Sequence, residues 1–262
     1  MSSNLYRTRS KGYMPSIVFK TILVDRSGSM CSFQGKQYDM VEHLLEDSKK
    51  QALETKKPTN VKLVSFDNKV TTIVDQDIST YHISRLELME ELAPRSSTRF
   101  NDTLIEEIDS LILKKDEYLK SLSKKAKDLN PDVAMVLIAI TDGEDNVSQH
   151  SMKGTREEML QFRQNGGRAI LMAANMDAEL VGGWYGFNPE KAITVHNSNP
   201  EAIENCYRAV STMTRNLTQG LDAPFTALQR SQSSQPMHND DALLLTPPTL
   251  VRNMTITRQY NH

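Results

Sequence analysis

The chain has 262 residues, which is enough for one large domain or two smaller ones. Apolar residues make up 38% and charged residues 24%, values typical of a globular protein and not of a wholly disordered one. The formal net charge of −2 gives no overall positive field, which argues against nucleic acid or an anionic membrane surface as a partner.

The first half of the chain alternates between strand-like and helix-like patterns. Residues 17–24 are β-branched and apolar, which predicts a buried strand, and residues 36–57 have the pattern of an amphipathic helix. Residues 61–66 and 69–74 flank an Asp-Asn turn and predict an antiparallel hairpin at a sheet edge. Residues 102–127 then predict a long amphipathic helix.

The second half continues the alternation. Residues 133–140 form the longest apolar run; it is too short to cross a bilayer and predicts a central parallel strand covered on both faces. A helix near 155–165, strands at 169–174 and 192–195, and a helix at about 200–217 follow. The pattern predicts an α/β fold with a doubly wound, mostly parallel sheet, one antiparallel edge strand and helices on both faces.

Composition also predicts the limits of the domain. We expect a flexible N-terminal segment at 1–15, a folded domain at 16–218 and a polar, mostly disordered tail at 219–262. Two cysteines are too few for a disulfide framework, and no apolar leader follows the basic N-terminus. We therefore expect a cytoplasmic or otherwise intracellular protein, or a virion component if the source is viral.

Oxygen-bearing side chains follow the first predicted strand. Asp25, Ser27 and Ser29 stand in an Asp-x-Ser-x-Ser sequence directly after this strand. A carboxylate and two hydroxyls suit a hard divalent cation such as Mg²⁺ better than zinc or copper. Two further loops at the same end of the predicted sheet, 96–104 before the long helix and 140–146 after the central strand, carry further oxygen-bearing side chains. The pattern favours a metal site built from three loops.

These residues, in this order, resemble the metal-ion-dependent adhesion site, or MIDAS, of the von Willebrand factor A (vWA) domain. All five ligand positions of the motif match in type, and the segment 174–187 is similar to stand-alone vWA proteins of bacteria, phages and large DNA viruses. The resemblance covers about 16–218. It implies a vWA, Rossmann-like fold in which Asp25, Ser27, Ser29, Thr98 and Asp142 bind Mg²⁺, with Mn²⁺ or Ca²⁺ as alternatives.

The resemblance also implies a function in protein binding. A neutral, incompletely filled metal shell accepts an Asp or Glu carboxylate from a partner protein. We expect Arg26 and Arg99 to add positive potential for such a partner, and Trp184 to be a candidate contact. The tail is a further candidate ligand, because Asp240 and Asp241 precede a short apolar run.

Two other classes of function remain open. The domain could be a structural component of a larger assembly, such as a viral particle or an ATPase-associated complex, with the metal stabilising the fold. A metal-dependent phosphohydrolase is disfavoured because Ser27 stands where such enzymes carry a second aspartate. We therefore expect no enzyme and no catalytic residues.

Overall fold

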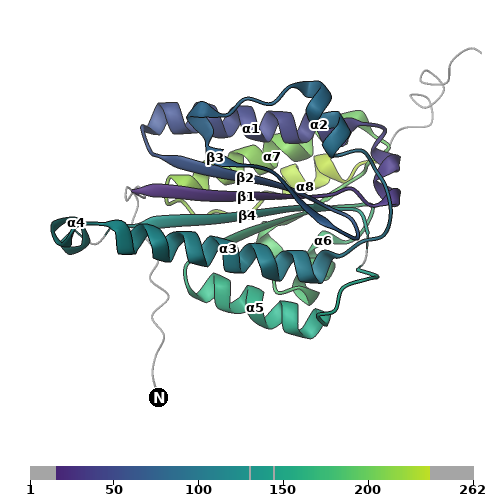
Figure 1. Ribbon diagram of the computed structural model, residues 1–262. Helices are drawn as coiled ribbons and strands as arrows, with labels where there is room; N and C mark the ends of the chain where they lie inside the picture. Colours follow the sequence, from purple (N-terminus) through teal and green to yellow (C-terminus); the bar gives the residue numbers. More distant parts are fainter. Residues whose placement is uncertain (1–15, 130, 144, 237–262) are drawn as a thin grey trace, which may run out of the picture.

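The computed structural model describes residues 16–129, 131–143 and 145–236, and its centre is a six-stranded sheet in the order β3-β2-β1-β4-β5-β6 (Figure 1). Neighbouring strands are parallel except for the β2–β3 pair, which is antiparallel with a register shift between Leu63 and Val64. The predicted hairpin at the sheet edge is confirmed. The strands are β1 (Ile17–Asp25), β2 (Thr59–Phe66), β3 (Val70–Asp77), β4 (Val133–Thr141), β5 (Arg168–Ala174) and β6 (Ala192–Val195).

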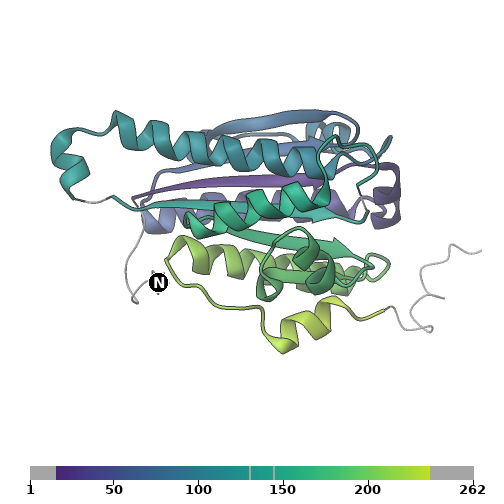
Figure 2. The same ribbon diagram turned by 90° about the horizontal axis from the view of Figure 1, so that it is seen from below.

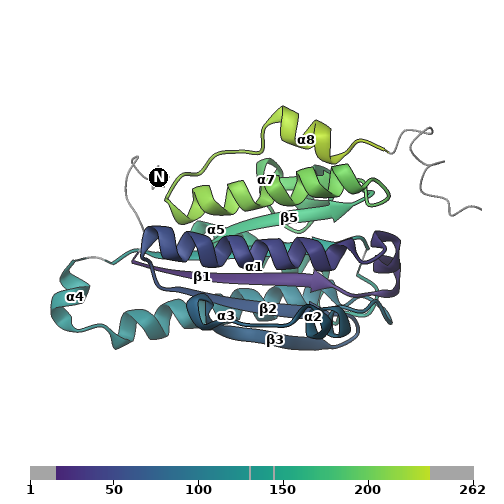
Figure 3. The same cartoon turned by 90° about the horizontal axis from the view of Figure 1, so that it is seen from above.

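Helices cover both faces of the sheet. The helices α1 and α7 lie side by side over one face (Figure 3), and α3 and α5 cover the other (Figure 2). In the described parts of the chain, no helix is long and apolar enough to cross a membrane. The helices are α1 (Lys36–Thr55), α2 (Arg85–Glu91), α3 (Phe100–Ser121), α4 (Lys124–Asp128), α5 (Met152–Gln164), α6 (Ala178–Trp184), α7 (Pro200–Thr218) and α8 (Ala227–Ser233), with short 3-10 turns η1 (Gly28–Phe33), η2 (Ile78–Thr80) and η3 (Pro189–Lys191).

The core lies in two layers on either side of the sheet. Every residue of β4 is buried, as the continuous apolar run predicts. Because side chains alternate along a strand, Ile138 packs in the layer under α1 and α7, whereas Leu137 packs in the layer under α3 and α5. The doubly wound α/β architecture predicted from the sequence is confirmed.

The strand order places β1 and β4 at the centre of the sheet, so their carboxyl ends lie side by side in the middle of one end of the sheet. The chain leaves β1 for β2 on one side, and it leaves β4 for β5 on the other. In sheets of this class the crevice for a ligand forms where the connections diverge, beyond the carboxyl ends of the strands. Asp25 is the last residue of β1, and Asp142 directly follows β4.

The folded part of the chain continues beyond residue 218. The described segment 219–236 includes α8, which packs along α7 and β6. Phe225 is buried, and its N–H donates to the carbonyl of Glu190, while the carbonyl of Ser233 accepts the N–H of His196 just beyond the edge strand β6. This segment therefore shields an otherwise open sheet edge. Residues 1–15 and 237–262, expected to be flexible, lie outside the described residues.

Candidate metal centre

The loop after β1 supplies the first three candidate ligands. Asp25 is fully buried, and its two carboxylate oxygens accept hydrogen bonds from Ser27 N (2.7 Å) and Thr141 Oγ1 (2.6 Å). The hydroxyls of Ser27 and Ser29 lie 3.0 Å apart. The side chain of Met30, in η1, is completely buried and anchors the loop to the core. These contacts fix a carboxylate and two hydroxyls on one tight turn.

The loop before α3 supplies Thr98. The side chain of Thr98 is 3% exposed. Two hydrogen bonds join its backbone to Asn146. The N–H of Thr98 donates to the side chain of Asn146 (2.9 Å), and the N–H of Asn146 donates to the carbonyl of Thr98 (3.0 Å). Asn146 belongs to the loop after β4. The second and third loops are therefore tied together at the candidate site.

The loop after β4 completes the group. Ser29 Oγ donates to Asp142 Oδ1 at 2.8 Å, which joins the first loop to the third. A Cβ atom placed on Gly143 would stand 3.5 Å from Ser29 Oγ and 3.6 Å from Thr98 Oγ1, so the missing side chain leaves space between these two hydroxyls. Two carboxylates and three hydroxyls from three loops thus converge beyond β1 and β4.

The two carboxylates are in an unfavourable electrostatic environment. Burial raises the pKa of Asp25 to about 6, although the hydrogen bonds from Thr141 and Ser27 lower it in part, and the nearby charge of Asp142 raises it further. Burial also raises the pKa of Asp142, against the hydrogen bond from Ser29. A divalent cation would relieve both effects, because it supplies the missing positive charge.

The donor set fits a hard cation. Each oxygen of Asp25 accepts one hydrogen bond, which leaves lone pairs for a metal, and the hydroxyls of Ser27, Ser29 and Thr98 add neutral donors. Within the described residues there is no cluster of three or more His, Cys, Asp or Glu side chains that could hold a metal. The five candidate ligands are two aspartates, two serines and one threonine, so none of them offers the nitrogen or sulfur atoms that zinc prefers.

A network of hydrogen bonds fixes the third loop on the start of α3. Burial raises the pKa of Asp102, but the N–H groups of Gln149 and His150 donate to its carboxylate and, with the His150 ring, lower the pKa to about 2. Asp145 accepts the N–H of Asn101 at 2.8 Å. Asp102 therefore holds the loop in place and does not belong to the group of candidate ligands.

The expectation for Arg26 is wrong. Its side chain is 2% exposed, forms an ion pair with Asp67 (3.2 Å) and donates to the carbonyl of Glu91 (2.9 Å). Along an extended backbone neighbouring side chains point in opposite directions. Because Asp25 and Ser27 face the candidate site, Arg26 points away from it and under the sheet edge, where a partner cannot reach it.

The other two candidate contact residues are accessible. Arg99 is 28% exposed and pairs with Asp102 and Glu106, each at 2.9 Å. Trp184, the last residue of α6, is 43% exposed. Its neighbour Tyr185 is buried against the Phe100 ring, and Phe187 is buried as well.

Sequence reasoning missed the residues that support the candidate ligands. Thr141 and Asn146 contact Asp25 and Thr98 directly, although the pattern of candidate ligands includes neither of them. Ser32 bonds to Asn197, which lies 165 residues away along the chain. Nothing in the local sequence signals such a contact, because it depends on how the sheet places β6 relative to η1.

No protein-family model matches the sequence, and neither does any curated protein. Among solved structures, the open conformation of the pilus adhesin SpaC from Lactobacillus rhamnosus GG matches with a TM-score of 0.55 and 12% identity, over 79% of this chain and 31% of the adhesin. The SpRpn10 VWA domain matches with a TM-score of 0.46 and 15% identity, over 79% and 100% of the two chains. Mussel byssus protein PTMP1, solved with a zinc-occupied MIDAS motif, gives 0.44 and 15%, over 78% and 46%.

This chain thus spans less than half of the length of the adhesin and of the mussel protein. The match to the adhesin concerns the fold, since the identity is low. This chain itself has the strand order β3-β2-β1-β4-β5-β6, an antiparallel edge pair and helices on both faces of the sheet. The chain has the fold of a von Willebrand factor A domain.

Proposed function

We propose that this chain binds a divalent metal ion through Asp25, Ser27, Ser29, Thr98 and Asp142, and that the bound ion recognises an acidic side chain of a partner protein. We further propose Mg²⁺ as the ion, because carboxylate and hydroxyl oxygens are its usual protein ligands. Two carboxylates balance its charge, and the coordination positions that the protein leaves open accept water or a partner's carboxylate.

One observation carries the proposal. The hydroxyl of Ser29 reaches the carboxylate of Asp142 across 113 residues of sequence, at the point where the sheet connections diverge. This contact brings the first and third loops together, and the gap beside Gly143 separates Ser29 from Thr98. These contacts support a metal site to which five oxygen-bearing side chains of three loops contribute.

Binding is a better proposal than catalysis at this site. A phosphohydrolase of the aspartate type requires an accessible carboxylate that attacks phosphorus. Asp25 is fully buried, and both of its oxygens are engaged by Thr141 and Ser27. Asp25 is therefore suited to hold a cation and poorly placed for nucleophilic attack.

The test separates metal binding from partner recognition. Calorimetric titration of the full chain with Mg²⁺, Mn²⁺ and Ca²⁺ is expected to show one site, and Asp25→Asn is expected to abolish it. The matched control is Asp77→Asn, which removes an exposed capping carboxylate at the end of β3. This control is expected to retain the site.

The second stage uses the metal-loaded protein and a short peptide that carries one glutamate, with its glutamine counterpart as the control. We expect binding of the glutamate peptide only in the presence of metal and only with Asp25 intact. Equal metal binding by Asp25→Asn and the parent would overturn the proposed metal site. Equal binding of the two peptides would overturn the proposed recognition of an acid.

A further inference from the structure

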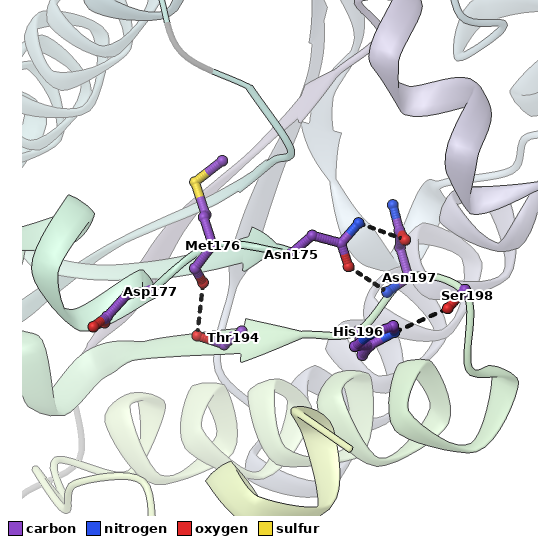
Figure 4. Close-up of a pocket in the computed structure, with 7 residues that line it drawn as sticks. All are labelled: Asn175, Met176, Asp177, Thr194, His196, Asn197 and Ser198. Carbon is purple, nitrogen blue, oxygen red and sulfur yellow. Dashed lines mark hydrogen bonds between the residues drawn. The ribbon is translucent and has the colours of Figure 1, made fainter. Parts of the chain in front are cut away.

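An open hollow of about 590 Å³ lies beyond the carboxyl ends of β5 and β6 (Figure 4). Two of its lining residues are asparagines: Asn175 directly follows β5, and Asn197 stands two residues after β6. Asp177 is the only carboxylate among the lining residues, which include neither lysine nor arginine, and it accepts N–H groups at the start of α6. The hollow is therefore polar but carries little charge, and it suits a neutral hydrogen-bonding group better than an ion.

The side chain of Asn175 is held in one orientation. Its Nδ2 donates to Asn197 Oδ1 at 2.7 Å, and its Oδ1 accepts the backbone N–H of Asn197 at 3.2 Å, so Asn175 is turned toward Asn197 (Figure 4). The backbone of Asn175 is left-handed, with a φ of 54°, and its N–H donates to the carbonyl of Val195 at 2.9 Å. A left-handed non-glycine residue costs free energy and persists where its surroundings fix it. Asn197 is only 6% exposed, so a buried residue fixes the exposed Asn175.

Asn175 keeps hydrogen-bonding capacity for a ligand. Among the described residues, its side-chain hydrogen bonds use one of the two N–H groups of Nδ2 and one lone pair of Oδ1. One donor and one acceptor of this exposed amide therefore remain. A second primary amide matches them, because it also carries a donor and an acceptor side by side. An ammonium group or a carboxylate would satisfy only one of the two.

Polar contacts connect this amide to the candidate metal centre. Asn197 Nδ2 donates to Ser32 Oγ, and Ser32 Oγ donates to Asp142 Oδ2 at 3.5 Å. Three contacts, none longer than 3.5 Å, thus lead from Asn175 to one of the proposed metal ligands. This path is no longer than about four residues of extended chain, which advance about 3.3 Å each. A partner whose acidic side chain is on the ion therefore reaches the hollow with a neighbouring side chain.

We infer that Asn175 determines the specificity of partner binding: its amide receives an asparagine or glutamine side chain that lies within four residues of the partner's acidic residue. This inference rests on the proposed function and names a second feature of the partner that this face recognises. Asn197 is a positioning residue, because it holds the Asn175 amide for the contact.

The experiment uses the Mg²⁺-loaded full chain and alanine-based peptides that carry one glutamate. Asparagine is placed at each of four positions on either side of the glutamate, and leucine, which has nearly the same shape, replaces it in the matched peptides. At one position we expect the asparagine peptide to bind about 3- to 10-fold more tightly than its leucine counterpart, the scale of one or two net hydrogen bonds.

Two glycine variants test whether Asn175 causes this preference. Asn175→Gly should remove it, because glycine adopts the left-handed backbone readily and lacks the amide. Lys56→Gly is the matched control. Lys56 is also exposed and left-handed, with a φ of 55°, but it lies at the C-terminal end of α1, so this variant should keep the preference.

The peptides also separate this inference from the proposed function. Absence of peptide binding, or binding that persists in EDTA, overturns the proposed function, and the inference falls with it. Metal-dependent binding with equal affinities for the asparagine and leucine peptides at every position overturns the inference alone, and this comparison needs no variant. A preference that Asn175→Gly retains does the same. Equal weakening of all peptides in Asn175→Gly would assign Asn175 to the partner's main chain, which also overturns recognition of an amide side chain.

Discussion

Lys20 is a buried cation in the middle of the sheet. Burial lowers the pKa of Lys20 to about 7, and the charge of Asp47 compensates only in part. Nζ donates to Ser48 Oγ at 2.7 Å. An unfolded lysine keeps its proton up to a pKa near 10.5, so between about pH 7 and 10.5 the unfolded chain binds more protons than the folded one. The free-energy cost of burying the charged Lys20 is therefore complete below about pH 7. The free energy of unfolding rises with pH between about pH 7 and 10.5 as this cost disappears.

We expect Lys20→Met to raise the free energy of unfolding at pH 7 by about 1 to 4 kcal/mol, because an apolar side chain replaces a desolvated charge. The gain should shrink between pH 7 and 10. Lys62→Met is the matched control on β2: it should lower stability, because Glu107, 2.7 Å from Lys62, would remain buried without its partner. Urea unfolding at several pH values measures both. A loss of stability in Lys20→Met at pH 7 would contradict this prediction and show that the contacts of Lys20 with Ser48 and Asp47 outweigh the cost of its burial.

A substitution at Gly143 tests whether the ion occupies the space beside the hydroxyls of Ser29 and Thr98. The Cβ of an alanine would meet both at ordinary contact distances, so Gly143→Ala should fold normally but fill the space beside the proposed ion. We expect a loss of Mg²⁺ affinity of about 10-fold or more, the usual scale for changes around a metal's ligands. Gly154→Ala, which places a Cβ 3.6 Å from Ser151 Oγ in α5, should keep the affinity. Calorimetry distinguishes the two, and equal affinities would place the ion elsewhere.

At the scale of elements, the packing of α8 against the rest of the domain depends on the side chain of Arg230. Arg230 donates to the carbonyls of Ala192 (2.9 Å) and Pro189 (3.0 Å), pairs with Glu179 and lies over the Phe225 ring. Hydrogen bonds that involve a charged group contribute about 1.5 to 3 kcal/mol, so Arg230→Ala should detach α8 locally. Faster exchange of the His196 and Phe225 amides, which are bonded within this contact, would report it.

Arg208→Ala provides the comparison for this prediction. Arg208 is also helical, but its side chain is 68% exposed and, among the described residues, it forms an ion pair only with Glu204 one turn earlier on α7. Such pairs contribute about 0.3 to 0.5 kcal/mol, so this variant should leave amide exchange at His196 unchanged. If Arg230→Ala behaves in the same way, the buried ring of Phe225 and not the guanidinium holds α8 in place.

Element prediction from the sequence succeeded where burial imposes a pattern. The apolar run at 133–140 and the periodic helix at 36–57 correspond to β4 and α1, because each buries a continuous surface. The predicted helix at 102–127 ends instead at Ser121, since Ser123 caps a separate helix, α4. The short helix α2 has one buried residue, Leu88, and so no periodic signal. The candidate ligands follow a local motif, whereas the Asn197–Ser32 contact depends on tertiary structure.

At the scale of the whole molecule, the candidate metal centre joins three loops that secondary structure alone does not hold together. Ser29 contacts Asp142, and Asn146 contacts Thr98. The carboxylates of Asp25 and Asp142 repel each other where the loops meet, because the charge of Asp142 raises the pKa of Asp25. A cation that binds only the folded chain stabilises it by about 2.7 kcal/mol at 100 times its Kd. We therefore expect Mg²⁺ to raise the Tm, and EDTA to reverse the shift.

The sign of the mutational effect distinguishes a metal site from a capping role for Asp25. Without metal, Asp25→Asn removes a buried charge whose pKa burial has raised, so this variant should be as stable as the parent or more stable at neutral pH. With saturating Mg²⁺, the parent should become the more stable of the two, because only the parent gains binding energy. Thermal melts of both proteins with and without Mg²⁺ measure this crossover. If Asp25→Asn lowers the Tm by the same amount in both conditions, the carboxylate of Asp25 stabilises the turn through its bonds to Thr141 and Ser27 and contributes nothing to metal binding.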